Sequence, residues 1–171
     1  MARRKNDSKI TVDTRELQKL ISQVNIRKRN FRPVWASAMK DLEQAHQRLF
    51  QTAGAPVGGW QPLEANSFYS KRSRGYGNEG ILIRTGTLED SLSSARHSEG
   101  VRDMGPTSME FGTKVEYAKF HQTGTRYMHE REVVYVPRTF ASDTGNKAAS
   151  WLIAGRAGIA RASGENAWTT R

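Results

Sequence analysis

The chain has 171 residues, of which 36% are hydrophobic and 26% charged, and its formal net charge is +10 at neutral pH. A chain of this length closes one hydrophobic core, and the modest apolar fraction indicates long exposed segments. It contains no Cys, which excludes disulfides, thiolate metal sites and a cysteine nucleophile. No apolar run has the length of a signal-peptide core or a membrane span, so we expect neither.

The positive charge is concentrated in the first forty residues, which hold eleven Lys and Arg against three Asp and Glu. The rest of the chain holds sixteen against fourteen. Such a basic segment can bind nucleic-acid phosphates, bind an acidic protein surface, or keep an arm solvated, and all three remain open. The candidate contact residues are Arg3, Arg4, Lys5, Lys9, Arg27, Lys28, Arg29 and Arg32.

Two amphipathic helices are predicted in the first third, after a basic flexible tail over residues 1–12. The first helix follows Asp13, which has capping-box spacing to Glu16, and the second begins near Asn30 and stops at Gly54. The apolar positions recur at helical spacing. They are Leu17, Leu20, Ile21 and Val24 in the first helix, and Phe31, Val34, Trp35, Ala38, Leu42, Ala45 and Leu49 in the second.

Residues 54–80 are rich in Gly, Pro, Ser and Asn, and their aromatic residues follow no period. We expect a long extended loop or arm. Loops of this length are uncommon in a compact domain unless a partner orders them. Its aromatics Trp60, Phe68, Tyr69 and Tyr76 either anchor an interface or fold back onto their own core, and the sequence leaves both alternatives open.

The second half of the chain mixes short strands with short helices. The predicted elements are a strand at 81–83, a helix at 88–95, a hairpin of strands at 101–104 and 108–113, a helix at 115–121, a strand at 132–136 and a helix at 148–162. The hairpin turns at Gly105 and Pro106 and places Met109 and Phe111 on one face. Gly155 and Gly158 weaken the last helix.

This order of elements predicts an α+β fold, in which amphipathic helices pack on a small antiparallel or mixed β-sheet. We expect one domain over residues 13–162, including the arm at 54–80, and a flexible C-terminal tail over residues 163–171.

Patterns typical of catalysis are missing from the sequence. The four His residues do not form an H-E-x-x-H zinc site, and neither a G-x-x-x-x-G-K-[ST] phosphate loop nor a G-x-S-x-G elbow occurs. We therefore expect no enzymatic activity, no metal and no cofactor.

A series of short strings over residues 58–140 resembles the phage virion-morphogenesis family of neck and tail-completion proteins. The strings are GGWQPL at 58–63, IL at 81–82, TGTL at 85–88, SL at 91–92, FGT at 111–113, VEYAKFHQTG at 115–124 and VPRTF at 136–140. Their order and spacing carry the resemblance. Several of these residues also have a structural interpretation, such as Gly124 as a left-handed helix stop and Pro137 as a strand end.

The resemblance implies a structural virion protein of a tailed phage, assembled in the host cytoplasm, that forms a homo-oligomeric and usually hexameric ring at the head-to-tail interface. It implies head-closure or connector proteins and the tail terminator or tail tube as neighbours, and double-stranded DNA in the lumen. The alternatives are a tail terminator or a non-specific DNA-binding protein. Candidate intersubunit contacts are Trp60, Phe68, Tyr69, Tyr76, Tyr117, His121 and Arg138.

Overall fold

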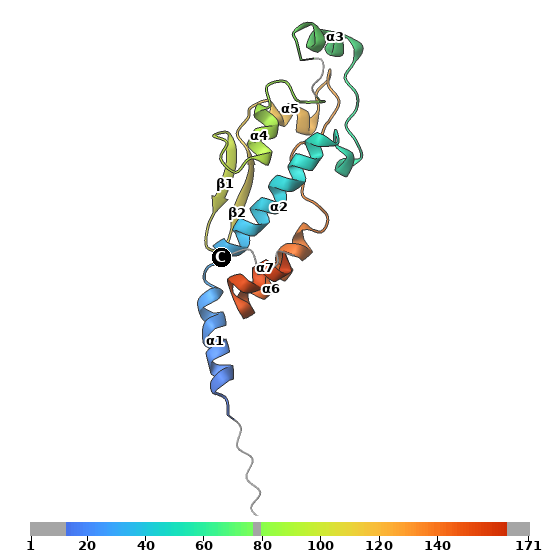
Figure 1. The fold of residues 1–171 in the computed structure, drawn as a ribbon. Coiled ribbons are helices and arrows are strands. Elements are labelled where there is room, and N and C mark those ends of the chain that lie inside the picture. The colour runs from blue at the N-terminus through green and yellow to red at the C-terminus, as the bar shows by residue number, and fades with distance from the viewer. Residues whose placement is uncertain (1–12, 77–79, 164–171) are drawn as a thin grey trace, which may run out of the picture.

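The computed structural model describes residues 13–76 and 80–163. The molecule is elongated, with α1 (Arg15–Arg27) projecting at one end and α3 (Ala65–Ser73) at the other (Figure 1). Between them lies a body in which a long helix packs against a hairpin and several short helices. The fold is α+β, as the sequence predicts.

The central element is α2 (Arg32–Gln51), which spans the body along its long axis (Figure 1). It has a Pro in its first turn, where the missing N–H leaves no hydrogen bond unmade. Its apolar stripe supplies a large part of the core, as the spacing of these residues predicts. The buried residues of α2 are Val34, Ala38, Met39, Leu42, His46, Leu49 and Phe50.

The sheet is a two-stranded antiparallel hairpin of β1 (Gly100–Met104) and β2 (Met109–Thr113), which confirms the predicted hairpin. Arg102 pairs with Phe111, and Met104 pairs with Met109. Because side chains alternate along a strand, these two pairs share one face of the hairpin.

Arg102 fastens the hairpin to the helices beside it. Its guanidinium lies 4.1 Å from the centroid of the Phe111 ring and forms an ion pair with Glu43 at 2.9 Å. It also donates to the main-chain carbonyls of Ser91 and Leu92, each at 3.0 Å. One side chain thus joins β1, α2 and α4 (Thr87–Ser93).

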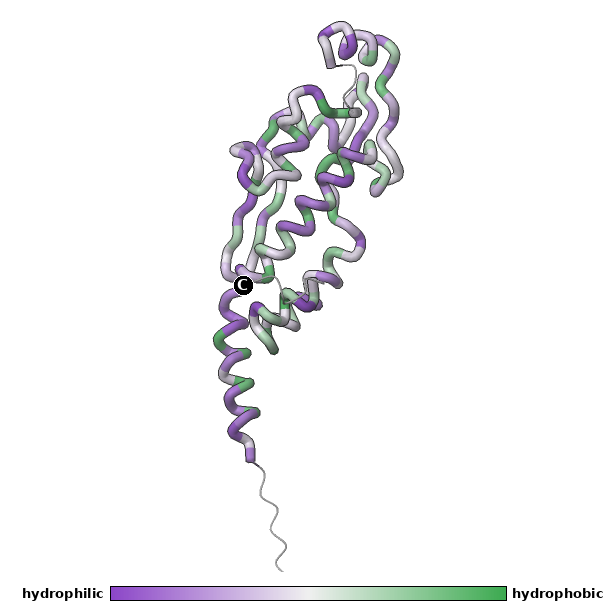
Figure 2. The backbone as a smooth tube through the Cα atoms, viewed as in Figure 1, coloured by the Kyte–Doolittle hydropathy of each residue, from purple (hydrophilic) through white to green (hydrophobic). Residues whose placement is uncertain are grey.

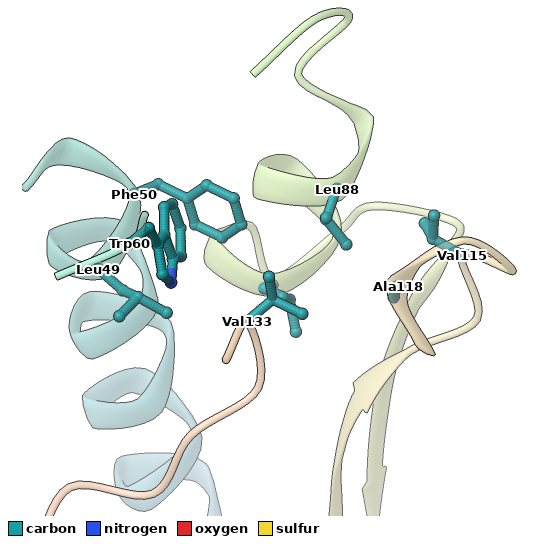
Figure 3. Packing of buried hydrophobic residues seen from close by; sticks show 8 residues of the cluster. Leu49, Phe50, Trp60, Leu88, Val115, Ala118 and Val133 are labelled. Carbon is teal, nitrogen blue, oxygen red and sulfur yellow. The ribbon is translucent and has the colours of Figure 1, made fainter. Parts of the chain in front are cut away.

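The core forms where the end of α2 meets α4 and α5 (Ala118–Thr123), as Figure 3 shows. Trp60 returns to this core after the turn that follows α2. Its ring packs edge-on against Phe50 at 5.2 Å, and its indole N–H donates to the carbonyl of Glu132 at 3.0 Å. The buried cluster consists of Leu49, Phe50, Trp60, Leu88, Leu92, Val115, Ala118 and Val133.

The predicted strand at 81–83 is wrong, because Leu82 has a φ of 66°, which interrupts an extended chain. The predicted strand at 132–136 is also wrong, since these residues pair with no strand in the part of the chain that the structure describes. Instead, the side-chain oxygen of Gln122 accepts the main-chain N–H groups of Val133 at 3.0 Å and Val134 at 2.9 Å. A side-chain amide here takes the place of a neighbouring strand.

The predicted C-terminal helix divides into α6 (Phe140–Ala154) and α7 (Arg156–Ala162). Gly155 has a φ of 65° and forms the corner between them. A Cβ atom added at Gly158 would lie 2.2 Å from the carbonyl oxygen of Ser150, so α7 approaches α6 at a distance that only glycine allows. Gly155 and Gly158, which were expected to weaken one long helix, instead divide it and allow α7 to pack against α6.

The segment predicted as a long loop contains two helices, the short 3-10 helix η1 (Ala55–Val57) and α3. Residues 58–60 return to the core, whereas α3 has no buried residue. The segment is therefore an arm with a helical tip.

The predicted tail at 1–12 and residues 164–171 of the predicted C-terminal tail lie outside the described residues. Ser163, the remaining residue of that tail, has its hydroxyl 3.2 Å from that of Ser37. Within residues 13–76 and 80–163, the structure has no helix with the length and apolar character that a membrane span requires.

Candidate subunit-contact site

The tip of the arm presents aromatic side chains that the chain itself does not bury. Phe68 is 42% exposed and Tyr69 is 66% exposed, and their ring centroids are 5.8 Å apart in an edge-on arrangement. Large aromatics held together on a projecting helix are well suited to anchor an interface. Phe68 and Tyr69 therefore remain candidates for contact with a neighbouring subunit.

A hollow of about 770 Å³ lies between the arm and the body. Its walls come from α3 and its flanks, from the chain leading into α4, and from α5 with the turn that follows it. Among the described residues that line it, Lys71, Arg74, Arg84 and Arg131 carry positive charge, against the single carboxylate of Glu64. The hollow is therefore suited to an acidic ligand.

Arg131 ties the base of the arm to the body. Its guanidinium is buried and donates to the carbonyl oxygens of Gln61 at 3.0 and 3.1 Å and of Pro62 at 3.2 Å. Burial lowers the pKa of Arg131 from its usual value, because removing the charge from water disfavours the protonated form. The residue adds positive potential to the hollow.

His121 lines the same hollow. Its Nδ1 atom is buried and has no hydrogen-bond partner among the described residues, and its ring lies edge-on to Tyr117 at 6.1 Å. Burial, and then the charge of Arg131, lower the pKa of His121, so the ring is neutral at neutral pH. This buried nitrogen is an unsatisfied polar atom in the wall of the hollow, and leaving it unpaired costs free energy.

Tyr76 and Tyr117 also line the hollow, so the structure brings together Tyr76, Tyr117 and His121 from separate regions of the sequence. The guanidinium of Arg84 lies over the Tyr76 ring at 5.4 Å. Phe68 and Tyr69 are on the α3 helix that forms one wall. Five of the seven predicted contact residues thus belong to one region of the molecule.

The other two predicted contact residues lie elsewhere. Trp60 is only 6% exposed, and its packing in the core corrects the expectation that it is available to a neighbour. Arg138 is exposed in the chain before α6 and is not among the described residues that line the hollow.

The cations of the hollow were not predicted from the sequence. The positive charge was expected in the first forty residues, yet Arg74, Arg84 and Arg131 form a second positive region around the arm. The run Lys71, Arg72, Arg74 at the end of α3 was the available signal. It is obscured because acidic residues elsewhere in residues 41–171 nearly balance the basic ones.

The predicted basic contacts of the N-terminal region separate into three groups. Arg3, Arg4, Lys5 and Lys9 lie outside the described residues. Arg27 donates to the carbonyls of Leu152 at 3.0 Å and Ile153 at 2.7 Å, and Arg32 donates to the carbonyl of Met104 at 3.2 Å, so both hold the fold together. Lys28 and Arg29 are exposed and remain candidates for contact with DNA or an acidic neighbour.

Across residues 13–76 and 80–163, the structure gathers no group of three or more His, Asp or Glu side chains that could hold a metal ion. The hollow with its aromatic arm is a candidate binding surface lined by cations, aromatic rings and the imidazole of His121.

Comparison with known proteins agrees with the strings noted in the sequence. No curated protein and no solved structure matches the chain. The sequence pattern of the phage virion morphogenesis family matches residues 12–153, which include the projecting helix α1, the core, the arm and nearly all of α6. The chain therefore belongs to the phage virion morphogenesis family, and it is a phage virion morphogenesis protein.

Proposed function

We propose that the protein forms a homo-oligomeric, hexameric ring in the neck of the virion, where it completes the tail and lets DNA pass from head to tail. Its neighbours are the head-closure or connector proteins on one side and the tail terminator or tail tube on the other. The role is structural, without a catalysed reaction. Membership of the family supports a virion role, and the ring and its position in the neck are the proposal.

The observation that carries the proposal is that both projecting ends of the molecule expose apolar side chains. Leu17, Leu20 and Ile21 are exposed along α1, and none of the residues of that helix is buried. In Figure 2 hydrophobic positions recur along this otherwise hydrophilic helix. At the opposite end, α3 exposes Phe68 and Tyr69. A helix of this length is marginal without packing, so neighbours that cover these faces are expected.

The test is a phage from which the gene for this chain has been deleted, imaged by negative-stain electron microscopy. We expect heads and tails that are unjoined, or tails that are unfinished, and joined virions when the wild-type gene is supplied in trans. Overlong tails would instead assign the protein as the tail terminator that caps the tube. Normal joined virions in the deletion phage would contradict both assignments.

A mass measurement in solution tests the oligomeric state. The purified chain is expected to be a monomer alone and a multimer when its neighbours are added, because its exposed ends are completed on assembly. A monomer under both conditions would count against the ring.

A further inference from the structure

The outer face of the hairpin carries two carboxylates that oppose each other. Asp103 on β1 pairs directly with Glu110 on β2, and both side chains are exposed. Like charges at directly opposite positions of an antiparallel pair destabilise it. Neither carboxylate forms an ion pair or hydrogen bond with a residue that the structure describes. A chain with a net charge of +10 nevertheless holds two unneutralised carboxylates opposite each other on one face of the hairpin.

The hollow at the arm carries charge of the opposite sign. Arg74 and Arg84 line it, both are exposed, and neither forms an ion pair within the described parts of the chain. The ring of Tyr76 under the Arg84 guanidinium, at 5.4 Å, holds this cation in place without neutralising it. Two exposed cations at the arm therefore match two exposed carboxylates on the hairpin.

These two surfaces lie at opposite ends of α2. The main-chain N–H of Phe31 donates to the carbonyl of Pro106 at 2.7 Å, which places the hairpin turn at the start of α2. The arm follows the other end of the helix, after Gln51. The 20 residues of α2 separate its two ends by about 30 Å. The carboxylates and the cations of one chain therefore cannot meet each other, whereas those of two copies can.

We propose that the hairpin of one copy docks at the arm of the next, with Asp103 and Glu110 paired to Arg74 and Arg84. This inference rests on the ring proposed above and names the surfaces that hold it together. The contact is head-to-tail, because each copy uses two different surfaces, and a head-to-tail contact generates a ring when its rotation closes. Rim charges of this kind fix the register and exclude wrong partners more than they add affinity.

The test uses charge reversal in phage that lack the gene and receive variants in trans. One variant carries Arg74→Glu with Arg84→Glu, and the other carries Asp103→Arg with Glu110→Arg. All four side chains are exposed, and the second variant keeps a like-charged pair on the hairpin, so thermal unfolding of both should match the wild type. Arg156→Glu with Arg161→Glu, at exposed positions of α7, is the matched control.

Each reversal alone places like charges at every contact of a ring, so the yield of joined virions is expected to fall by about tenfold or more. The control should give the wild-type yield. When the two reversal variants are supplied together, an alternating ring has opposite charges at every contact, and the yield should recover. Wild-type yield from either reversal variant, absence of recovery from the mixture, or an equal loss in the control would overturn the pairing.

Cross-linking tests the geometry independently. Because the chain has no Cys, Asp103→Cys with Arg84→Cys introduces a single reactive pair of positions. A short bis-maleimide applied to particles should give a ladder of cross-linked species that extends beyond the dimer. A ladder that stops at the dimer would mean a reciprocal pair of copies and would contradict the head-to-tail contact, as would no product. Either single Cys variant provides the control.

The two proposals fail in different ways. Complementation of the deletion phage by the wild-type gene tests the neck function alone. The charge-reversal and cross-linking experiments test the contact between the hairpin and the arm. If the arm reversal stays defective in the mixture and the purified variant has lost affinity for duplex DNA, then Arg74 and Arg84 bind DNA and the pairing is wrong.

Discussion

The ring of His46, in the C-terminal half of α2, accepts the main-chain N–H of Tyr135 at its Nε2 atom, over 3.3 Å. Nδ1 lies 2.7 Å from the carbonyl of Leu42. Since Nε2 must be the acceptor, Nδ1 carries the proton and donates it to that carbonyl. The two hydrogen bonds require a neutral ring in a fully buried position, and they join α2 to the extended chain after α5.

This arrangement predicts a pH-dependent stability. Burial, the largest cause, lowers the pKa of His46 to about 4, against 6.5 for an unperturbed His, and the charge of Arg102 acts in the same direction. Between these two values the unfolded chain binds the proton and the folded chain does not, so stability falls as pH drops from 6.5 to 4. The loss should reach about 3 kcal/mol, measured by urea unfolding at each pH.

Carboxylates elsewhere also titrate near the lower end of this range, so the comparison needs a variant without the imidazole. His46→Gln keeps hydrogen-bonding capacity at the site and removes the titration. Its free energy of unfolding should vary less with pH between 6.5 and 4 than that of the wild type. Equal pH dependence in the two proteins would show that His46 is not the group responsible.

Two glycines of the C-terminal helices should respond in opposite directions to the same substitution. Gly158→Ala places a methyl group against the carbonyl of Ser150 in α6, and this overpacking should cost about 1–3 kcal/mol. Gly145→Ala, at an exposed position of α6 with nothing within 4 Å, should stabilise the protein by about 1 kcal/mol. Thermal unfolding of both variants measures the difference. A similar effect at the two sites would contradict the close approach of α7 to α6.

Substitutions of the aromatic residues in the arm segment should differ in their effect on the free energy of unfolding. Trp60→Ala removes a core side chain and its hydrogen bond to Glu132, and should cost about 3–5 kcal/mol in the free energy of unfolding. Phe68→Ser with Tyr69→Ser alters only exposed positions and should change stability by less than about 0.5 kcal/mol.

In the deletion phage, the Phe68 and Tyr69 double variant should nevertheless reduce the yield of joined virions. A fully active double variant would remove these two residues from the set of subunit contacts, whatever its stability.

Binding to duplex DNA tests whether the basic junction between α1 and α2 faces the lumen. Lys28 and Arg29 are exposed there, and replacing both with Ala should reduce the salt slope of binding by about two, one for each lost phosphate contact. Deletion of residues 1–12 should reduce it further. Salt-insensitive or undetectable binding by the wild type would assign these cations to a protein neighbour or to solvent.

The elements that were predicted correctly are those whose signal is local. The apolar stripe of α2 and the Gly105-Pro106 turn of the hairpin depend on residues within a few positions of each other. The segment at 132–136 resembles a strand because it is rich in Val and Tyr. However, its N–H groups are bound by Gln122 and His46. Side-chain partners that substitute for a strand are contributed by distant parts of the chain, so composition does not reveal them.

At the candidate site, too, the sequence predicts only what depends on local signals. Phe68 and Tyr69 were predicted as contact candidates because they are aromatics in a segment without an apolar period. Trp60 shares that description and is buried, since the turn at Gly54, with a φ of 82°, directs the chain back to Phe50. The hollow itself brings together residues from three separate regions of the sequence. Its positive charge therefore cannot be recognised in the sequence, because the cations come together only when the chain folds.

The length of α2 has a consequence for the symmetry of the assembly. The hairpin turn lies at one end of this helix and the arm at the other, so each added residue would move them apart by about 1.5 Å and rotate one relative to the other by about 100°. A head-to-tail contact closes only when the rotation between successive copies divides a full turn. In the contact that we propose, the number of residues in one helix therefore contributes to the rotation that fixes the number of copies in the ring.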